Sequence, residues 1–202
     1  MIKHVVFDMG GVLINNPFDA YLNARVSDAD DRVVLMHELF RSVEWIRMDR
    51  GMMDEAAVAA AVCRRVPERL HETVRTLIDN WYQTASPIAG VEAIVRRLKA
   101  AGYGLYILSN ASTKFHGFDE KLPAIECFDG RFVSCDVHFV KPEPAIYQTF
   151  LKQYGLRAEE CVFIDDVNAN VEGAVNVGLS GIVFFGDAKR LEAQLGALGL
   201  RF

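Results

Sequence analysis

The sequence predicts an α/β fold in which helices cover both faces of a doubly wound parallel sheet, with a helical segment inserted after the first strand. Short apolar runs alternate with amphipathic helical patterns, most runs end in polar or glycine residues, and one long stretch has helical periodicity alone. The chain has 202 residues, of which 51% are hydrophobic and 24% charged. This size and composition suit one packed core that carries a modest insertion.

Four apolar runs are expected to form strands of the sheet, and they cover residues 2–7, 105–108, 161–164 and 182–185. Polar residues or glycines follow the first three runs directly: Asp8 with Gly10 and Gly11, Ser109 with Asn110, and Asp165 with Asp166. The carboxyl ends of parallel strands lie at one edge of a sheet, where α/β proteins usually bind their ligands. We therefore expect these side chains to share one site.

Helices are expected between the strands. Apolar residues recur three or four positions apart over 91–101, 146–154 and 171–175, and glycine follows each pattern at Gly102, Gly155 and Gly178. This spacing is typical of amphipathic helices, and glycine suits the left-handed conformation that ends many of them. Helices that connect parallel strands in this way form right-handed crossovers.

Residues 17–86 break the alternation, because their apolar residues have helical spacing only, in groups over 33–43, 57–62 and 70–81. We predict a core made of residues 1–16 and 87–202, and a helical cap, residues 17–86, that stands over the strand ends. The chain crosses between these parts near residues 15–17 and 86–90. Proline or glycine occurs in both crossings, which makes them candidate hinges for cap closure.

Charge and hydropathy exclude several classes of protein. The 22 Lys and Arg residues are outnumbered by 27 Asp and Glu, and a net charge of −5 makes nucleic-acid binding unexpected. No apolar run approaches the roughly 20 residues that span a bilayer, and the first residues lack a signal-peptide pattern. We expect a cytoplasmic protein without membrane contact and with buried, free cysteines. Nothing in the sequence predicts an oligomeric state.

The residues at the strand ends, together with Lys141, supply the parts of a phosphoryl-transfer site. Asp8 offers a carboxylate nucleophile, Ser109 a hydroxyl for the phosphoryl oxygens and Lys141 a cation for the transition state. Asp165 and Asp166 offer ligands for a metal ion. Taken singly, each has an ordinary explanation as a turn former, a helix cap or a solvated side chain.

Charge in this cluster independently predicts a divalent cation. The three aspartates carry three negative charges and Lys141 one positive charge, which leaves −2 where a phosphate dianion would enter. Each repulsion between unit charges costs about 4 kcal/mol at roughly 4 Å and an effective dielectric constant near 20. Mg²⁺ would bring the pocket near neutrality and bridge to a phosphate oxygen. We expect no phosphate binding without it.

Four segments, 7–13, 108–110, 140–144 and 163–166 with 170–174, resemble the motifs of the haloacid dehalogenase superfamily of hydrolases. The closest resemblance is to the subgroup with a small helical cap after the first strand, and within it to sugar-phosphate phosphatases similar to bacterial α-glucose-1-phosphatase. The resemblance covers essentially the whole chain. It implies a Rossmann-like core and an Mg²⁺-dependent phosphatase that acts on a small phosphorylated metabolite, such as a sugar phosphate.

The same resemblance implies a role for each site residue. Asp8 attacks phosphorus and forms an aspartyl-phosphate, while Ser109 and Lys141 assist as catalytic residues. The implied phosphate-binding residues are Gly10, Gly11, Ser109, Asn110 and Lys141. The implied metal ligands are Asp8, the carbonyl of Gly10, Asp166 and, through water or by orienting the others, Asp165. Asn170 supports the loop that carries the two adjacent aspartates.

One position departs from the family pattern. The residue two places after the nucleophile is usually an aspartate that acts as general acid and base, and here it is Gly10. Such catalysis contributes about 10²–10⁴ in rate. Either the leaving group needs little protonation, as in an anomeric or acyl phosphate, or another side chain supplies the proton. Glu44, Asp49 and His37 of the cap are candidates.

Two alternatives to a phosphatase remain. A 2-haloacid dehalogenase, in which an aspartate attacks carbon without a metal, would leave Asp165 and Asp166 as unexplained negative charge. A non-catalytic phosphate-binding or partner-binding domain would not need the nucleophile Asp8. Substrate choice is expected to depend on cap residues among Phe18, Tyr21, Trp45, Arg47 and Met48, although aromatic and Met residues at helical spacing are more often core.

Overall fold

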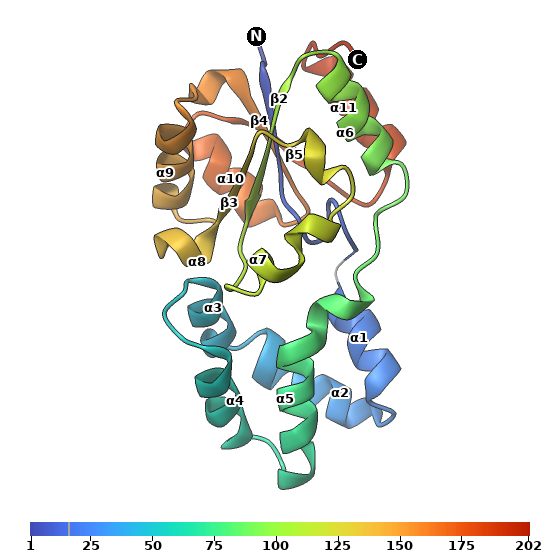
Figure 1. Cartoon of the computed structure of the whole chain (residues 1–202), viewed down its shortest axis with the longest axis vertical. Coiled ribbons are helices and arrows are strands. Elements are labelled where there is room, and N and C mark those ends of the chain that lie inside the picture. Colours follow the sequence, from blue (N-terminus) through green and yellow to red (C-terminus); the bar gives the residue numbers. More distant parts are fainter. Residues whose placement is uncertain (16) are drawn as a thin grey trace.

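The computed structural model describes residues 1–15 and 17–202 and confirms the predicted α/β fold. An α/β core carries both termini, and a group of helices lies at the opposite end of the molecule (Figure 1). The core contains a five-stranded parallel sheet in the order β3-β2-β1-β4-β5. The strands are β1 His4–Phe7, β2 Gly104–Ser109, β3 Gly130–Val133, β4 Cys161–Asp165 and β5 Ser180–Val183.

Strand register brings the predicted site residues to one edge of the sheet. Phe7 of β1 lies opposite Ile107 of β2 and Ile164 of β4. Asp8 and Asp165 therefore leave the sheet side by side, at the carboxyl ends of neighbouring strands.

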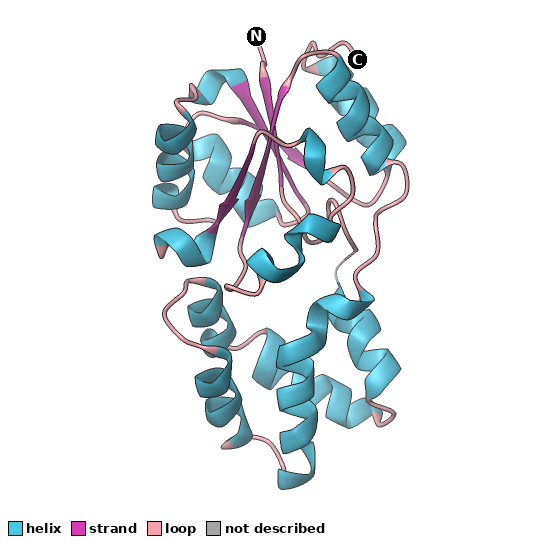
Figure 2. Cartoon of the chain, viewed as in Figure 1, coloured by secondary structure: helices cyan, strands magenta, loops and turns pink. Residues whose placement is uncertain are grey.

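Two pairs of helices sandwich the sheet (Figure 2). One face is covered by α6 Val91–Ala100 and α11 Ala188–Ala197, and the other by α9 Pro144–Tyr154 and α10 Asn168–Asn176. Successive strand residues point to opposite faces, so Val5 and Phe7 pack with the first pair whereas Val6 packs with the second. The predicted helices α6, α9 and α10 are confirmed, and Gly155 ends α9 in the left-handed conformation.

The remaining core elements are short: the α-helices α7 Phe115–Phe118 and α8 Ser134–Val137, and the 3₁₀ segments η4 Asp119–Lys121, η5 Ile125–Cys127 and η6 Ala158–Glu160. Two expectations about the sheet were wrong. The apolar pattern does not predict β3, an edge strand in which just Phe132 and Val133 are buried. The last strand was expected at residues 182–185 but begins and ends two residues earlier, because Phe185 is apolar but exposed to solvent.

The inserted segment is helical, as predicted. Its elements are α1 Pro17–Arg25, α2 Ala29–Leu35, the π-helix η1 Met36–Phe40, α3 Val43–Asp49, α4 Glu55–Cys63, the 3₁₀ segment η2 Glu68–Leu70, α5 His71–Asn80 and the 3₁₀ segment η3 Trp81–Thr84. The pattern over 33–43 is divided between three elements rather than one. Ser42 begins a new helix by accepting a hydrogen bond from the Trp45 N–H at 3.1 Å. Val33 and Val43 are exposed instead of buried.

The two crossings between the insertion and the core pair with each other. The N–H of Asn15 donates to the carbonyl of Ser86 at 2.9 Å, and the N–H of Ser86 donates to Asn15 Oδ1 at 2.8 Å. Ile14 and Pro87 form an antiparallel bridge next to them. Asn16, part of the predicted first crossing, lies outside the described residues. The division into a core of residues 1–16 and 87–202 and a cap of residues 17–86 remains a prediction.

Within the described chain, no helix has the length and apolar character needed to cross a bilayer. The cytoplasmic location and the absence of nucleic-acid and membrane partners remain predictions. All four cysteines are free; Cys135 and Cys161 are buried, whereas Cys63 and Cys127 are half-buried.

Candidate active site

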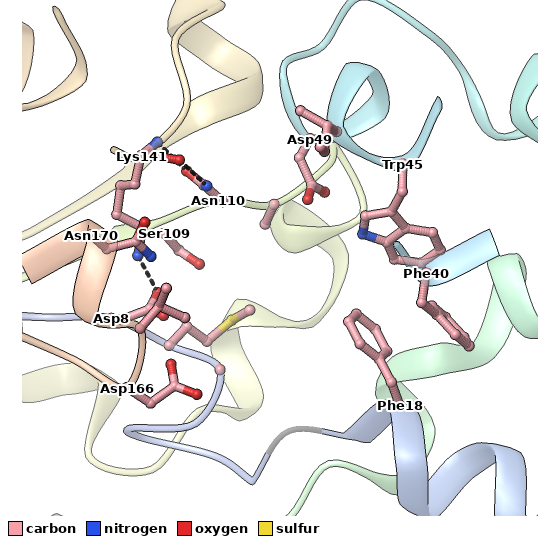
Figure 3. Close-up of a pocket in the computed structure, with 15 residues that line it drawn as sticks. Asp8, Phe18, Phe40, Trp45, Asp49, Ser109, Asn110, Lys141, Asp166 and Asn170 are labelled. Carbon is pink, nitrogen blue, oxygen red and sulfur yellow. Dashed lines mark hydrogen bonds and ion pairs between the residues drawn. The ribbon is translucent and has the colours of Figure 1, made fainter. Parts of the chain in front are cut away.

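Asp8 lies at the base of a pocket between the core and the helical insertion (Figure 3). Its backbone N–H donates to the carbonyl of Ile164 at 2.8 Å, which fixes the residue beside the end of β4. Its carboxylate oxygen Oδ1 is 2.8 Å from Nζ of Lys141. The side chain is 12% exposed, so Asp8 is buried but open on the side that faces the pocket.

Lys141 connects the predicted nucleophile to a second buried carboxylate. Its Nζ lies 2.8 Å from Asp8 Oδ1, 2.7 Å from Asp165 Oδ2 and 3.1 Å from the carbonyl oxygen of Leu108. A lysine ammonium has three N–H donors, so these acceptors satisfy it completely. The arrangement holds a buried positive charge against Asp8, where screening by solvent is weak.

Asp165 is fully buried, and both its oxygens are engaged by the protein. Oδ1 accepts from the backbone N–H of Val167 at 2.8 Å, and the amide of Asn170 lies 3.1 Å from each oxygen. Lys141 occupies the remaining direction. Asn170 is held in turn by Tyr147, whose hydroxyl donates to its backbone carbonyl at 2.7 Å.

Asp166 points to the other side of the loop, toward the pocket, and is partly exposed. No lysine or arginine of the described chain lies within ion-pair distance of its carboxylate. A Cβ at Gly11 would be 2.3 Å from Asp166 Oδ2, and Gly11 has a φ of +75°. Glycine is therefore required there for both backbone conformation and space.

One oxygen from each of Asp8, Asp165 and Asp166 lies within 4.8 Å of the other two. Carboxylate and carbonyl oxygens are the ligands that Mg²⁺ and Ca²⁺ prefer, whereas zinc usually takes nitrogen or sulfur. This donor set fits a magnesium ion. Both oxygens of Asp165 already accept hydrogen bonds from the protein. The carboxylates that remain available to a metal ion in the pocket are therefore those of Asp8 and Asp166.

Asn110 fixes the loop that carries the lysine. Its amide Nδ2 donates to the carbonyl of Lys141 at 3.0 Å, and its Oδ1 accepts from the Lys141 N–H at 2.8 Å. The side chain predicted to bind phosphate thus clamps the backbone of Lys141. Ser109, at the end of β2, is 2% exposed and lines the pocket beside it.

The pKa values of this cluster reflect burial and an excess of negative charge. Burial raises the pKa of Asp8 to about 7, opposed by Lys141 and reinforced by Asp165. Burial and the charge of Asp165 also raise the pKa of Asp166. Burial alone would lower the pKa of Lys141, but Asp165 and Asp8 raise it above its ordinary value. A bound divalent cation would favour the ionised carboxylates.

The pocket has a volume of about 290 Å³ and two chemically different walls. Its core wall includes Asp8, Met9, Gly10, Ser109, Asn110, Ala111, Lys141, Asp166, Val167 and Asn170. Its cap wall consists of Phe18, Phe40, Trp45, Ile46 and Asp49. The core wall is thus largely polar, and the cap wall is apolar apart from Asp49.

Three aromatic rings of the cap wall support one another. Phe18 stacks on Phe40 with ring centroids 4.3 Å apart, and Trp45 contacts both rings edge to face at 5.3 Å and 4.9 Å. Such packing fixes their orientation. The pattern of the sequence did not separate Phe40 from the surrounding core residues, and we did not predict that it lines the pocket.

Among the cap residues predicted to face the pocket, Phe18 and Trp45 do so. Tyr21 and Met48 are buried elsewhere, and Arg47 is exposed outside the pocket. Core packing was therefore the correct interpretation for Tyr21 and Met48.

Among the candidate proton donors, the structure brings just Asp49 into the pocket. Glu44 instead pairs with Arg65 at 2.9 Å, and His37 lies on the surface beside Glu38 at 3.1 Å. Burial raises the pKa of Asp49 to about 7; Lys141 and the indole of Trp45 oppose this shift.

Comparison with known proteins agrees with the fold. A family model described as haloacid dehalogenase-like hydrolase matches residues 2–178. Sesquiterpene phosphatase astK of Aspergillus oryzae is 29% identical over 185 residues, which cover 89% of this chain and 88% of that protein. The (S)-2-haloacid dehalogenase of Pseudomonas putida is 27% identical over 188 residues, covering 88% and 82%.

A family enzyme from Bacteroides thetaiotaomicron, solved with magnesium and inorganic phosphate, superposes with a TM-score of 0.68 at 19% identity, covering 95% of this chain and 99% of that one. At that identity the likeness shows the fold alone. The two sequence relatives named above are a phosphatase and a dehalogenase, so both activities occur among proteins similar to this chain. With most of its length matched by the family model, the chain belongs to the haloacid dehalogenase-like hydrolases.

Proposed function

We propose that this protein is an Mg²⁺-dependent phosphatase that hydrolyses a small phosphate monoester through an aspartyl-phosphate on Asp8. The observation that carries the proposal is the position of the Asp8 carboxylate, which lies 2.8 Å from Lys141 and within 4.8 Å of the Asp166 carboxylate, at the base of one pocket. A nucleophile, a cation and an open metal ligand are thereby combined.

In the first step an oxygen of Asp8 attacks phosphorus, and the bond from phosphorus to the leaving oxygen breaks. Lys141 favours the ionised form of Asp8 and offsets the charge that enters with the phosphate. The hydroxyl of Ser109 is suited to donate to a phosphoryl oxygen. Water then attacks the phosphorus, and Asp8 is released as a carboxylate.

Asp8, Asp166 and the backbone carbonyl of Gly10 would hold Mg²⁺, which when bound neutralises negative charge on the phosphoryl oxygens. Asp165 has a different role in this proposal, because the protein engages both its oxygens. It orients Lys141 and the loop of Asp166. Such supporting groups commonly set the geometry of metal ligands.

The substrate is a small alcohol phosphate with an apolar face. A volume of about 290 Å³ lies at the small end of ligand pockets, and the rings of Phe18 and Trp45 line it opposite the phosphate site. The apolar cap wall favours an apolar carbon skeleton over the polar sugar that the sequence resemblance suggested. The name of the Aspergillus relative, a sesquiterpene phosphatase, points in the same direction.

A 2-haloacid dehalogenase is the second candidate, since a relative of that activity matches most of the chain. It would use Asp8 to attack carbon. It gives no role to Asp166, which faces the pocket with no lysine or arginine at ion-pair distance in the described chain. The phosphatase accounts for both residues.

The test is phosphate release from p-nitrophenyl phosphate and acetyl phosphate, with and without Mg²⁺. Asp8→Asn should abolish the metal-dependent release, whereas Asp30→Asn, a matched change on the surface of α2, should retain it. Chloride release from a 2-haloacid without metal, together with no phosphate release, would reject the phosphatase in favour of the dehalogenase.

A further inference from the structure

A phosphatase that acts on an alcohol phosphate through Asp8 needs a group to protonate the leaving oxygen, and position 10 offers none. Gly10 lines the pocket, and a Cβ built on it would meet no atom within 4 Å. The space for a side chain at this position is therefore open. Of the described cap residues, Asp49 is the one acid that lines the same pocket.

The carboxyl group of Asp49 projects from the end of α3 into the space between Asp8 and the aromatic wall (Figure 3). The indole of Trp45, one helical turn earlier, lies beside it and lowers the pKa of the carboxyl group, against the effect of burial.

Asp49 is also tied by its backbone to the loop that follows Ser109. The hydroxyl of Ser134 donates to the carbonyl of Asp49 and accepts from the N–H of Ala111 at 3.0 Å. Ser134 is fully buried. One side chain thus links the end of α3 to the loop that follows Ser109, the residue predicted to bind phosphate through its hydroxyl.

Arg50 links the same turn to the loop of Lys141. Nη1 of Arg50 donates to Oε2 of Glu143 at 3.1 Å. The backbone carbonyl oxygen of Arg50 lies 2.9 Å from Nδ1 of His138. A Cβ at Gly51 would be 2.3 Å from the carbonyl oxygen of Cys135, so the turn packs directly on the core backbone. These contacts fix the position of Asp49 relative to the phosphate site.

We propose that Asp49 is the general acid and base of the reaction, supplied by the cap in place of a side chain at position 10. The inference rests on the proposed phosphatase function. As Asp8 bonds to phosphorus, the leaving oxygen takes the proton of Asp49 and departs as the alcohol. The Asp49 carboxylate then removes a proton from the water that attacks phosphorus, which frees Asp8 and phosphate and restores the protonated acid.

The charges around Asp49 suit both halves of this cycle. Burial and the charge of Asp8 raise its pKa, whereas Lys141 and the indole of Trp45 lower it, and the result is about 7. An acid with a pKa near neutrality is present in both forms at physiological pH. No other titratable group is among the causes of this shift.

The test compares leaving groups in Asp49→Asn, which keeps the size of the side chain. Turnover of butyl phosphate, a poor leaving group, should fall about 10²–10⁴-fold. With p-nitrophenyl phosphate the first step needs no acid, so a rapid burst of one p-nitrophenol per active site should precede slow turnover. The phosphorylated protein should then accumulate, detectable by intact mass. Glu44→Gln is the matched control and should behave as the native protein.

Gly10→Asp provides a rescue, because its side chain has open space. The double variant Asp49→Asn with Gly10→Asp should regain butyl phosphate turnover and lose the accumulated phosphoryl group. Native-like turnover of both substrates by Asp49→Asn would overturn the inference and leave the proposed function intact. So would loss of turnover of both substrates in Asp49→Asn without a burst and without recovery in the double variant, since Asp49 would then be structural. Absence of phosphate release from the native protein would instead reject the proposed function itself.

Discussion

At the scale of single residues, two adjacent aspartates have opposite environments. Asp165 is fully buried and accepts hydrogen bonds from Lys141, Val167 and Asn170, whereas Asp166 faces the pocket. Successive residues at a strand end point in opposite directions, which explains the division. Asp165 therefore contributes to stability, and Asp166 costs stability unless a cation is bound.

Exchange of each aspartate for asparagine separates these roles. Asp165→Asn places a neutral amide against buried Lys141 and should lower the free energy of unfolding by about 3 kcal/mol, as loss of a buried partner does. Asp166→Asn should leave the stability of the metal-free protein unchanged or slightly raised, because one repulsion is removed. Urea unfolding in the presence of a chelator measures both, and equal losses in the two variants would contradict the assignment.

The pocket acids also make stability depend on pH. Asp8 and Asp49 have folded pKa values of about 7, above the ordinary value near 4. Between about pH 4 and about pH 7, Asp8 and Asp49 therefore keep their protons in the folded protein, whereas the unfolded chain has released them. The free energy of unfolding of the metal-free protein should therefore fall as pH rises from about 4 to about 7.

Asp49→Asn should flatten this decline by up to about 1.4 kcal/mol per pH unit, the contribution of one proton. Unfolding curves of the two proteins over that pH range provide the measurement. Parallel pH profiles would show that Asp49 is ionised throughout the range.

Sequence was sufficient to find the residues that follow strands. Asp8, Ser109 and Asp165 could be assigned to one site because parallel strands deliver their ends to one edge. The clamp of Asn110 on Lys141 joins two loops 31 residues apart, so no local pattern shows it. The orientation of the Asp49 side chain depends on how the inserted helices dock on the core. The sequence alone therefore gave no reason to prefer Asp49 over Glu44 or His37 as the proton donor.

At the scale of elements, the docking of α3 on α8 positions the cap. Gly51, just beyond α3, has a φ of +69° and lies against the carbonyl oxygen of Cys135. Gly102, between α6 and β2, has a φ of +88° but nothing within 4 Å of its would-be Cβ. The two glycines share a left-handed backbone conformation, which glycine adopts without strain, and differ in the space available for a side chain.

Substitution by alanine isolates the contribution of that contact. Gly102→Ala should lose about 1–2 kcal/mol from left-handed strain alone. Gly51→Ala should lose more, and should slow turnover of butyl phosphate because the turn that carries Asp49 is displaced. Thermal unfolding and steady-state rates test this, and equal effects of both changes would show that the turn tolerates a side chain.

Elements with clear periodicity were predictable, and those without it were not. α6, α9 and α10 combine apolar spacing with a following glycine, and all three are present. β3 buries two apolar residues of four, too few for a pattern, and α11 was missed because just Leu191 and Leu195 of its ten residues are buried. The π-helix η1 interrupts the regular spacing of an α-helix. The pattern over residues 33–43 therefore predicted the wrong residues to face the core.

At the scale of the whole molecule, the described residues of the helical insertion contact the core in separate regions, of which two bear on how the insertion could move; a third contact is the ion pair between Lys114 and Asp79 at 3.2 Å. The first of the two is the turn after α3, where Arg50 pairs with Glu143. The second lies beside the crossings, where Tyr82 stacks on Phe118 with ring centroids 5.1 Å apart. A single apolar cluster runs from the sheet into the cap between them. Closure by rotation at the crossings would therefore have to break the first contact while keeping the second.

Arg50→Ala should loosen the first contact without touching the pocket lining. Hydrogen exchange is expected to become faster in α3 and in the crossing at residues 86–90, whereas exchange in β1 and β4 should not change. Mg²⁺ with a phosphate mimic should slow exchange in the same crossing. Identical exchange in the native protein and the variant would show that the turn after α3 does not hold the cap.

The proposed mechanism requires a covalent bond between Asp8 and phosphorus, and that bond can be detected directly. The protein would be mixed with p-nitrophenyl phosphate and Mg²⁺, quenched in acid within the first turnover, digested and mapped by mass spectrometry. A phosphoryl group on the peptide that contains Asp8, absent in Asp8→Asn and without Mg²⁺, is the predicted result. Phosphate release without any phosphoryl group on Asp8 would contradict the account.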